Sequence, residues 1–191
     1  MHSLYWSCPL LEKSKIQAKN ANTSADVLDS ASVGFAPIAR EDARILILGS
    51  LPGQRSLQEA EYYAHPRNAF WPIMNDLFSI DGDYTRRCAD LVANGIALWD
   101  VLAQSIRPGS MDADIQVESS KVNDFKQFFD EHQSIKVVCF NGRKAGELFS
   151  RFADQERFAS RLRYEALPST SPAHASMSFD QKLSIWRNAI C

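Results

Sequence analysis

The stretch RILILGSLPGQRS, residues 44–56, joins a short apolar run to a loop rich in glycine and small polar residues. The run 44–49 is typical of a strand that is buried on both faces of a sheet. In the loop, Gly49 and Gly53 allow the backbone to approach a ligand closely, and exposed N–H groups there can hold an anion or an oxygen. The loop lacks the Gly-Lys-Ser/Thr ending of a nucleotide-phosphate loop, so an ordinary tight turn is the alternative interpretation.

Predicted strands alternate with predicted helices on both sides of this stretch. Strands are expected at 44–49, 96–101, 135–140 and 162–169, and helices at 69–78, 83–95, 123–132, 141–153 and 178–190, the last with Ser178 as N-cap. This alternation predicts a three-layer α/β/α sandwich around a mostly parallel, four-stranded central sheet. In such folds ligands bind beyond the carboxyl ends of the strands.

The two ends of the chain differ in character. Residues 1–35 are largely polar and small, without helical or strand periodicity, which predicts a loose N-terminal extension. Residues 36–191 are expected to form one domain, since a chain of 191 residues is enough for a single core and short for two.

Composition narrows the class of protein. Apolar residues make up 45% and charged residues 23%, which is normal for a globular protein. No apolar run approaches the roughly 20 residues needed to cross a bilayer, and we do not expect the first residues to act as a secretory signal. The four cysteines, at 8, 88, 139 and 191, are too widely spaced for a metal site or a disulfide framework. We therefore expect a cytoplasmic monomer without metal or cofactor and without membrane contact. With a net charge of −2, any nucleic-acid surface must be local.

The segment YYAHPRNAFW, residues 62–71, crowds aromatic rings and polar groups together. A ring that stacks on a base of single-stranded nucleic acid contributes about 1–3 kcal/mol. Asn68 can donate and accept, so it could hold a water molecule, or it could cap the helix that follows. Phe70 and Trp71 are interpreted as core residues.

The segment FNGRK, residues 140–144, places Asn141 and Gly142 before two cations at a predicted strand-to-helix junction. Arg143 and Lys144 near a helix N-terminus are unfavourable for the helix dipole, but they suit a bound phosphate. Two solvated cations are the alternative interpretation.

The segment LPSTSPAHAS, residues 167–176, sets short hydroxyls and a histidine between prolines. Such a stiff loop suits contacts to phosphate, although it could equally be a polar turn before the last helix. No nucleophile elbow or Ser/His/Asp order is evident, so acyl transfer is not supported.

Together these segments resemble the uracil-DNA glycosylase superfamily, and most closely its hypoxanthine-DNA (deoxyinosine) glycosylases. The similarity covers about residues 33–188, and it lies in ILILGSLPGQRSL, YYAHPRNAFWPIM, GIALWDVL, RPGSMDADI, NDF, FNGRKA and LPSTSPAHA. The resemblance implies that the asparagine of the HPRN block, Asn68, is catalytic. Leu51 stands where many members of the wider superfamily carry the Asp or Asn that positions the attacking water, and Leu167 stands where a histidine often begins the second motif. These departures argue against ordinary uracil excision.

The resemblance and the residues together give an expected site. Substrate-binding residues are expected to be Gly49, Ser50, Leu51, Pro52, Gly53, Tyr63, His65, Asp100 and Asn141. DNA-binding residues are expected to be Ser56, Gly142, Arg143, Lys144, Ser169, Thr170, Ser171 and His174. Tyr63 is expected to stack on the flipped purine, and Asp100 to read an N–H of the base or else to cap the following turn. His174 could donate to the leaving base or bind phosphate.

The function predicted is a monofunctional DNA glycosylase of base excision repair, a hydrolase acting on N-glycosyl bonds. Its substrate would be double-stranded or single-stranded DNA with a deaminated base, hypoxanthine before others, because a flipped base costs less to extract from an imperfect pair. Two alternatives stay open. One is a glycosylase of the same superfamily for uracil or mismatched thymine, and the other is a non-catalytic protein that binds nucleotides or damaged DNA.

Overall fold

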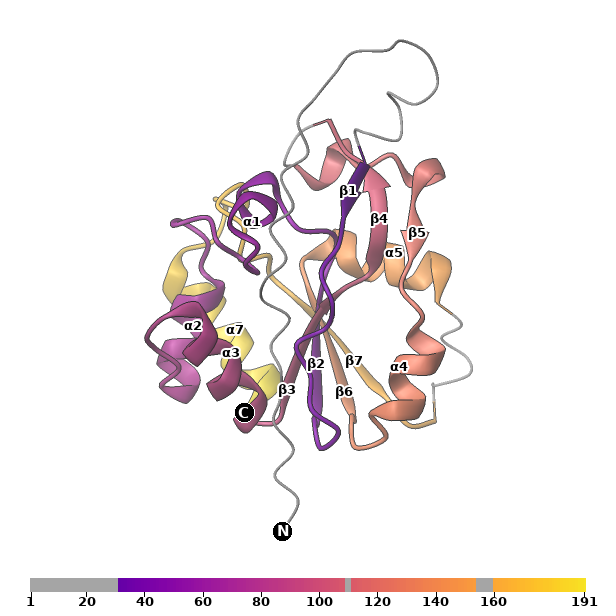
Figure 1. The fold of residues 1–191 in the computed structure, drawn as a ribbon. Helices are drawn as coiled ribbons and strands as arrows, with labels where there is room; N and C mark the ends of the chain where they lie inside the picture. Colours follow the sequence, from indigo (N-terminus) through magenta and orange to yellow (C-terminus); the bar gives the residue numbers. More distant parts are fainter. Residues whose placement is uncertain (1–30, 109–110, 154–159) are drawn as a thin grey trace.

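The computed structural model describes residues 31–108, 111–153 and 160–191. Its centre is a parallel sheet in the strand order β3-β2-β6-β7 (Figure 1). The strands are β2 (Ile45–Gly49), β3 (Ile96–Asp100), β6 (Val137–Asn141) and β7 (Arg163–Leu167). The predicted sandwich with a four-stranded parallel sheet is confirmed, and each strand begins and ends within two residues of the range expected for it.

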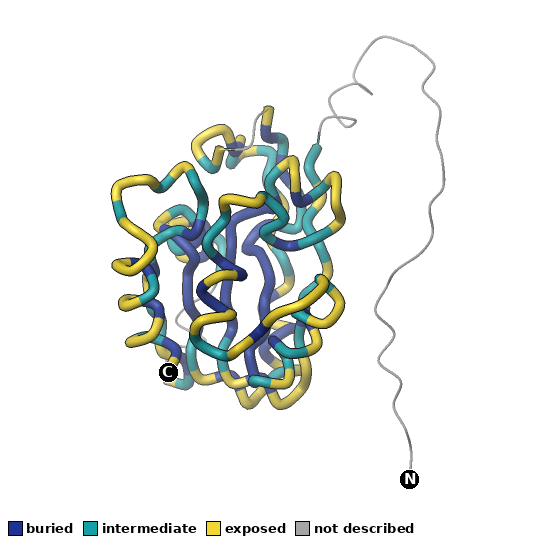
Figure 2. The backbone as a smooth tube through the Cα atoms, turned by 90° about the vertical axis from the view of Figure 1, so that its left-hand side faces the viewer, coloured by how far each residue is buried: buried dark blue, intermediate teal, exposed yellow. Residues whose placement is uncertain are grey.

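Strand β2 is buried on both faces, as its apolar run predicts. Leu46, Ile47 and Leu48 have no exposed surface, and Figure 2 shows the central strands as the buried part of the molecule. Because successive side chains point to opposite faces, Leu46 and Leu48 join one core cluster while Ile47 joins the other. The sheet therefore needs a helical layer on each side.

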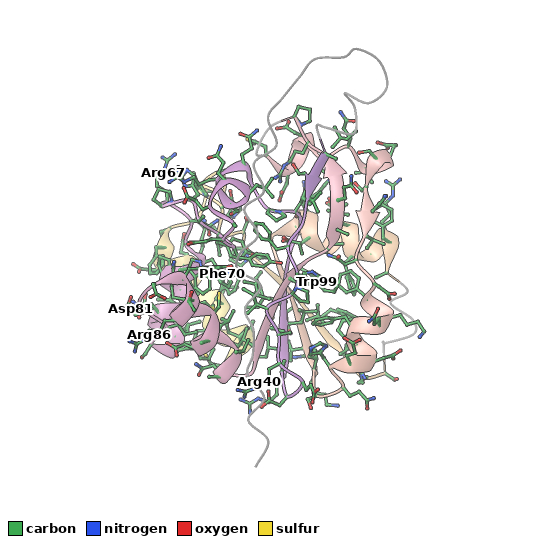
Figure 3. The ribbon with its side chains drawn as sticks, in the orientation of Figure 1. Arg40, Arg67, Phe70, Asp81, Arg86 and Trp99 are labelled. Carbon is green, nitrogen blue, oxygen red and sulfur yellow. The ribbon has the colours of Figure 1, made fainter. Side chains whose placement is uncertain are left out.

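Two groups of helices supply these layers (Figure 1). One face carries α2 (Phe70–Phe78), α3 (Tyr84–Ala93) and α7 (Phe179–Ile190), and the other carries α4 (Phe125–Glu131) and α5 (Arg143–Phe152). Phe70 and Trp99 mark the two cores, and they lie on opposite sides of the sheet in Figure 3. Phe70 and Trp71 are both buried, so their interpretation as core residues is confirmed.

Local capping fixes where the helices begin. Ser178 accepts a hydrogen bond from the Gln181 N–H, and the Gln181 side chain accepts one from the Ser178 N–H, which forms a complete capping box. The predicted N-cap of the last helix is thus confirmed. Asp83 caps α3 in a similar way by accepting from the Arg86 N–H. Within the described ranges, no helix is long and apolar enough to cross a membrane.

A second, antiparallel sheet and a short helix lie beyond the carboxyl ends of the central strands (Figure 1). The helix is α1 (Gln54–Glu59), and the sheet consists of β1 (Ala31–Val33), β4 (Leu102–Ile106) and β5 (Lys121–Val122). Two 3₁₀ turns, η1 (Asp112–Asp114) and η2 (Val117–Ser119), lie between β4 and β5 in the chain. None of these elements was predicted from the sequence. Strand β1 pairs with β4 although it falls within the expected extension, while residues 1–30 of that extension lie outside the described residues.

Candidate active site

A cavity of about 510 Å³ lies at the carboxyl ends of the central strands. This volume is within the range of roughly 300–1,000 Å³ typical of ligand pockets. Of the residues expected from the sequence, it is lined by Gly49, Ser50, Leu51, Pro52, Gly53, Ser56, Tyr63, His65, Asn68, Asp100, Asn141, Arg143, Ser169, Thr170, Ser171 and His174. Gly142 and Lys144 are the two expected residues that do not line it; Gly142 lies in an adjoining groove instead.

The backbone of the glycine loop is fixed by its own carbonyl groups. The carbonyl oxygens of Gly49 and Ser50 accept from the backbone N–H groups of the chain just after β3, at 2.9 and 3.1 Å. The next two, of Leu51 and Pro52, accept from the guanidinium of Arg107, the Leu51 bond being 3.2 Å long. Four consecutive carbonyls are thus held, so the loop presents a preformed wall to the cavity.

Arg107 is a site residue that the sequence did not reveal. Its side chain is 1% exposed and lies 4.0 Å from a carboxylate oxygen of Asp112, which in turn accepts from the Ser50 hydroxyl at 3.2 Å. Both Arg107 and Asp112 line the cavity. The resemblance block RPGSMDADI contains both residues, but it assigned no role to Arg107, whose partners are backbone carbonyls more than fifty residues away.

Leu51 does not act through its side chain. It is 6% exposed and packs in the core cluster shared by β3 and α4. A side chain in this position cannot hold water for attack at a sugar, so the chemistry must come from another residue.

Asp100 lies at the end of β3, beside Gly49. A Cβ added to Gly49 would lie 2.3 Å from Asp100 Oδ1 and 3.1 Å from the Tyr63 hydroxyl, so only glycine leaves room for both groups here. Asp100 is 3% exposed, and its Oδ2 has no hydrogen-bond partner among the described residues. Burial raises the pKa of Asp100 to about 8, with a further rise from Asp112 and an opposing effect of Arg107. The carboxyl is therefore mostly neutral at pH 7.

Asn68 lines the same cavity as this carboxyl, in the turn before α2. Its Oδ1 accepts from the Phe70 N–H at 3.0 Å, and its own N–H donates to the His65 carbonyl at 2.8 Å. The residue is half-buried and lines the same cavity as the glycine loop. A carbonyl oxygen has two lone pairs, so Oδ1 can serve the helix and still accept from a water molecule. The N-cap of α2 is Ala69, so Asn68 is not the N-cap itself, but its bond to the Phe70 N–H supports the first turn of the helix and is compatible with catalysis.

Tyr63 is held in an unusual backbone conformation, with φ of 55°. Its ring stacks on the buried Phe70 ring at a centroid distance of 4.2 Å and an interplanar angle of 29°. Left-handed backbone at a non-glycine residue is costly and persists where the surroundings enforce it. Burial raises the pKa of the Tyr63 hydroxyl, which stays a neutral donor and acceptor on the cavity wall.

The loop after β7 is anchored at several points. The Trp186 indole donates to the Pro168 carbonyl at 3.1 Å, and the Lys182 ammonium donates to the His174 carbonyl at 2.9 Å. Between these, the Thr170 carbonyl accepts from the Ala69 N–H at 2.9 Å, next to Asn68. The loop is thereby tied to the HPRN segment, and the two form one wall.

Asn141 makes the central link of this wall. Its Nδ2 donates to Thr170 Oγ1 and its Oδ1 accepts from the Thr170 N–H, both at 2.8 Å. Both residues are buried. Asn141 thus uses its amide to position the loop, whereas the sequence suggested contact with the base.

We expect Asn141→Ala to lower the free energy of unfolding by about 2–3 kcal/mol, because it leaves two buried groups of Thr170 without partners. Thr170→Val removes one of the two bonds and should cost less. Chemical denaturation of both variants measures the difference. Equal stability of Asn141→Ala and the wild type would show that the loop is held without this amide.

The remaining polar residues lie either in the wall of the cavity, as Ser56 does, or at its exposed mouth, as Arg143 does. Ser56 is buried and its hydroxyl accepts from the Ala64 N–H at 3.2 Å, which braces the turn that leads to Asn68. Arg143 is 92% exposed in the first turn of α5 and pairs with Glu147, at 3.3 Å. Nε2 of His174 is buried and has no partner among the described residues. Exposed Arg67, which points outward in Figure 3, adds positive charge near the HPRN turn.

Such a cavity, preformed at the strand ends and bordered by hydroxyls and an exposed arginine, suits a base that has been rotated out of DNA. The fold and the site are those expected of a DNA glycosylase, a hydrolase that acts on the N-glycosyl bond.

Comparison with known proteins agrees with this class. The model of the uracil DNA glycosylase superfamily matches residues 36–189. A hypoxanthine DNA glycosylase of Methanosarcina barkeri is 40% identical over 117 residues, 60% of this chain and 73% of that protein. A hypoxanthine DNA glycosylase of Methanosarcina acetivorans is 36% identical over 150 residues, 76% of this chain and 89% of that protein.

A solved structure shows the same fold. It is the solution NMR structure of a Methanosarcina acetivorans protein, provisionally described as a uracil DNA glycosylase. It superposes with a TM-score of 0.68 and 32% identity, covering 83% of this chain and 98% of that one. The chain belongs to the uracil-DNA glycosylase superfamily, and the resemblance found in its sequence is confirmed.

Proposed function

We propose that this protein is a monofunctional glycosylase that removes hypoxanthine from deoxyinosine in DNA, as a step of base excision repair. The observation that carries the proposal is that Asn68 lines the same cavity as Gly49 and Asp100. The two relatives named hypoxanthine DNA glycosylases support the choice of base.

Binding begins with extraction of the nucleotide from the helix. The cost of flipping is a few kcal/mol and is smaller at a mismatch, a condition that inosine meets opposite most bases. The flipped purine would lie between the glycine loop and Tyr63, whose ring is backed by Phe70 on one face. A ring held in this way provides a stacking surface without loss of side-chain freedom on binding.

The chemical step follows from Asn68. The bond between C1′ and the purine nitrogen breaks, and its electron pair leaves with the base, which takes up a proton. Water adds to C1′ of the oxocarbenium-like sugar and loses a proton to solvent. Asn68 is too weak a base to remove that proton outright, so its part is to orient the water with the free lone pair of Oδ1.

The DNA backbone would be held at the mouth by Arg143 and the hydroxyls of Ser169 and Ser171, with His174 at the inner end of the loop. Phosphate contacts of this kind position the strand without reading its sequence. Both double-stranded and single-stranded DNA are compatible with this arrangement. Action as a monomer, without a metal, in the cytoplasm is part of the proposal.

A monofunctional reaction is supported by Lys182. A lyase step needs an amine that can attack the sugar. Lys182 is only 5% exposed, and its ammonium donates to the His174 carbonyl at 2.9 Å. It therefore serves the loop, which supports water as the proposed nucleophile.

The test is incubation of the purified protein with an oligonucleotide that contains one deoxyinosine. We expect release of free hypoxanthine and a strand that breaks only after alkali. Parallel oligonucleotides with uracil or a mismatched thymine should react at least about tenfold more slowly, in line with the two relatives named hypoxanthine DNA glycosylases. Tight binding of the inosine duplex without base release would show a binding protein, and faster uracil release would show a different substrate.

A further inference from the structure

We propose that Asp100 recognises the base as a neutral carboxylic acid, and that its ionisation switches recognition off. This inference rests on the proposed function and names the chemical group that the site selects, a ring N–H beside a ring carbonyl. Hypoxanthine and uracil both carry this lactam edge.

The position of the carboxyl is the first step. Asp100 pairs with Gly49 in the register of β3 and β2, so both residues end their strands at the cavity floor. The missing Cβ of Gly49 leaves the space in which the carboxyl sits. Its own backbone carbonyl accepts from the Asn123 amide at 2.8 Å, which fixes the strand end from the other side. The side chain is therefore held where the far edge of a flipped base would arrive.

The second step is the lack of a partner. Oδ2 of Asp100 is buried and has no hydrogen-bond partner among the described residues. A buried polar atom without a partner is rare and costly, and one in a ligand cavity indicates a group that the ligand satisfies. The Tyr63 hydroxyl is buried beside the same glycine.

The charges around Asp100 form the third step. Facing it are Asp112 from η1, Arg107 from the end of β4, and the hydroxyls of Tyr62 and Tyr63 from the turn before α2. Asp112 favours the neutral carboxyl and Arg107 opposes it. Arg107, however, directs its guanidinium at the carbonyls of Leu51 and Pro52 and forms no ion pair with Asp100 among the described residues. Desolvation therefore prevails, and the proton stays on the carboxyl up to about pH 8.

The chemistry of recognition then follows. A neutral carboxyl offers an O–H donor and a C=O acceptor side by side, which match the carbonyl and the N–H of a lactam through two parallel hydrogen bonds. A carboxylate keeps the acceptor, loses the donor and sets a negative charge against the carbonyl oxygen of the base. Adenine has a hydrogen-bond donor where the lactam has its carbonyl and an acceptor where the lactam has its N–H. We expect adenine to be excluded instead at the flipping step, because an intact base pair resists extraction.

The matched variants are Asp100→Asn and Asp100→Leu. The asparagine amide offers the same donor and acceptor but does not ionise, whereas leucine offers neither. Single-turnover rates on the deoxyinosine oligonucleotide are measured from about pH 6 to about pH 9.5, across the region where the carboxyl ionises. The wild-type rate should fall about tenfold per pH unit above pH 8, because activity requires the protonated form.

We expect Asp100→Asn to keep the neutral-pH rate within about tenfold and to lose the part of the alkaline decline that begins near pH 8. The lactam also loses its proton in alkali, but that decline is common to all variants. Asp112→Asn removes the charge that favours the neutral form, so its alkaline decline should begin at lower pH than in the wild type. Asp100→Leu should lose at least about 100-fold. An unchanged alkaline decline in Asp100→Asn, or wild-type activity in Asp100→Leu, would overturn the inference.

A readout that needs no catalysis separates this inference from the proposed function. The folded-state pKa of Asp100 is raised, so wild-type stability is lost as the pH rises from about 4 to about 8 and is level above that. The melting temperature of Asp100→Asn relative to the wild type should therefore increase over this range. If no lesion is cleaved yet this increase is observed, the proposed function fails while the neutral carboxyl stands. A constant difference would show that Asp100 is ionised throughout.

Discussion

Asn68→Ala should lower the rate of base release from a deoxyinosine oligonucleotide by about 100-fold to 1,000-fold, the effect typical of removing one group that acts on the transition state. The reason is that alanine cannot orient the water that adds to C1′. Affinity for the uncleaved inosine duplex should stay within about threefold, because phosphate contacts carry most of the affinity for DNA. Single-turnover kinetics and a binding titration measure the two quantities.

The helix cap must be separated from the chemistry in this variant. Losing the bond from Oδ1 to the Phe70 N–H should cost about 1 kcal/mol of stability, a fall in melting temperature of about 2–4 °C for a chain of this size. Asn68→Asp keeps an oxygen for both the cap and the water, so it should retain more activity than alanine. Asn75→Ala, on the exposed side of α2, is the matched control and should be fully active. Full activity of Asn68→Ala would remove this amide from the mechanism.

The central sheet could be predicted because its signal is local. An apolar run such as 45–48 has only one stable placement in a soluble protein, between two layers that cover it, and the helices that follow each strand provide those layers. The carboxyl ends of parallel strands then meet at one edge. For this reason Gly49, Asp100 and Asn141 could be assigned to one site before any coordinates.

The second sheet could not be predicted in the same way. Strand β4 begins two residues after β3 ends, so the segment 96–106 reads as a single strand with a polar tail. Its partner β1 lies about seventy residues earlier, in a segment where apolar and polar residues do not alternate. Pairing between segments so far apart leaves no recognisable pattern in the sequence of either strand. The sheet matters for function because it leads into Arg107, the residue that holds the glycine loop.

The roles of individual polar residues also depended on pairing across the fold. Asn141 and Thr170 were assigned to base and DNA from their chemistry, but each satisfies the other inside the wall. The sequence shows which groups can donate or accept, whereas it does not show which of them are already engaged. Asp100 Oδ2 differs from these engaged groups, because it is buried and still without a hydrogen-bond partner in the described part of the chain. It is therefore the atom that points to a bound ligand.

The two glycines of the loop provide the sharpest structural test of where the base lies. In Gly49→Ala the new Cβ would lie 2.3 Å from Asp100 Oδ1, so the carboxyl must move from its place on the cavity wall. A shift of about 1 Å in a group that contacts the substrate costs about 100-fold in rate, and overpacking costs about 1–3 kcal/mol in stability. We expect both losses, measured by single-turnover rates and by denaturant unfolding.

Gly53→Ala is the matched control, since a Cβ there would meet nothing within 4 Å and the backbone has φ of −69°. Its stability should change by less than about 1 kcal/mol, because the lower entropy of the unfolded chain offsets a slightly poorer N-cap for α1. Its activity should stay within about threefold of the wild type, as expected for a residue whose added methyl contacts no other group. If both variants lose activity equally, the loop acts through its backbone flexibility. If Gly49→Ala is as active as Gly53→Ala, the base does not lie against Asp100, and both the recognition of the lactam edge and the position assigned to the purine are wrong.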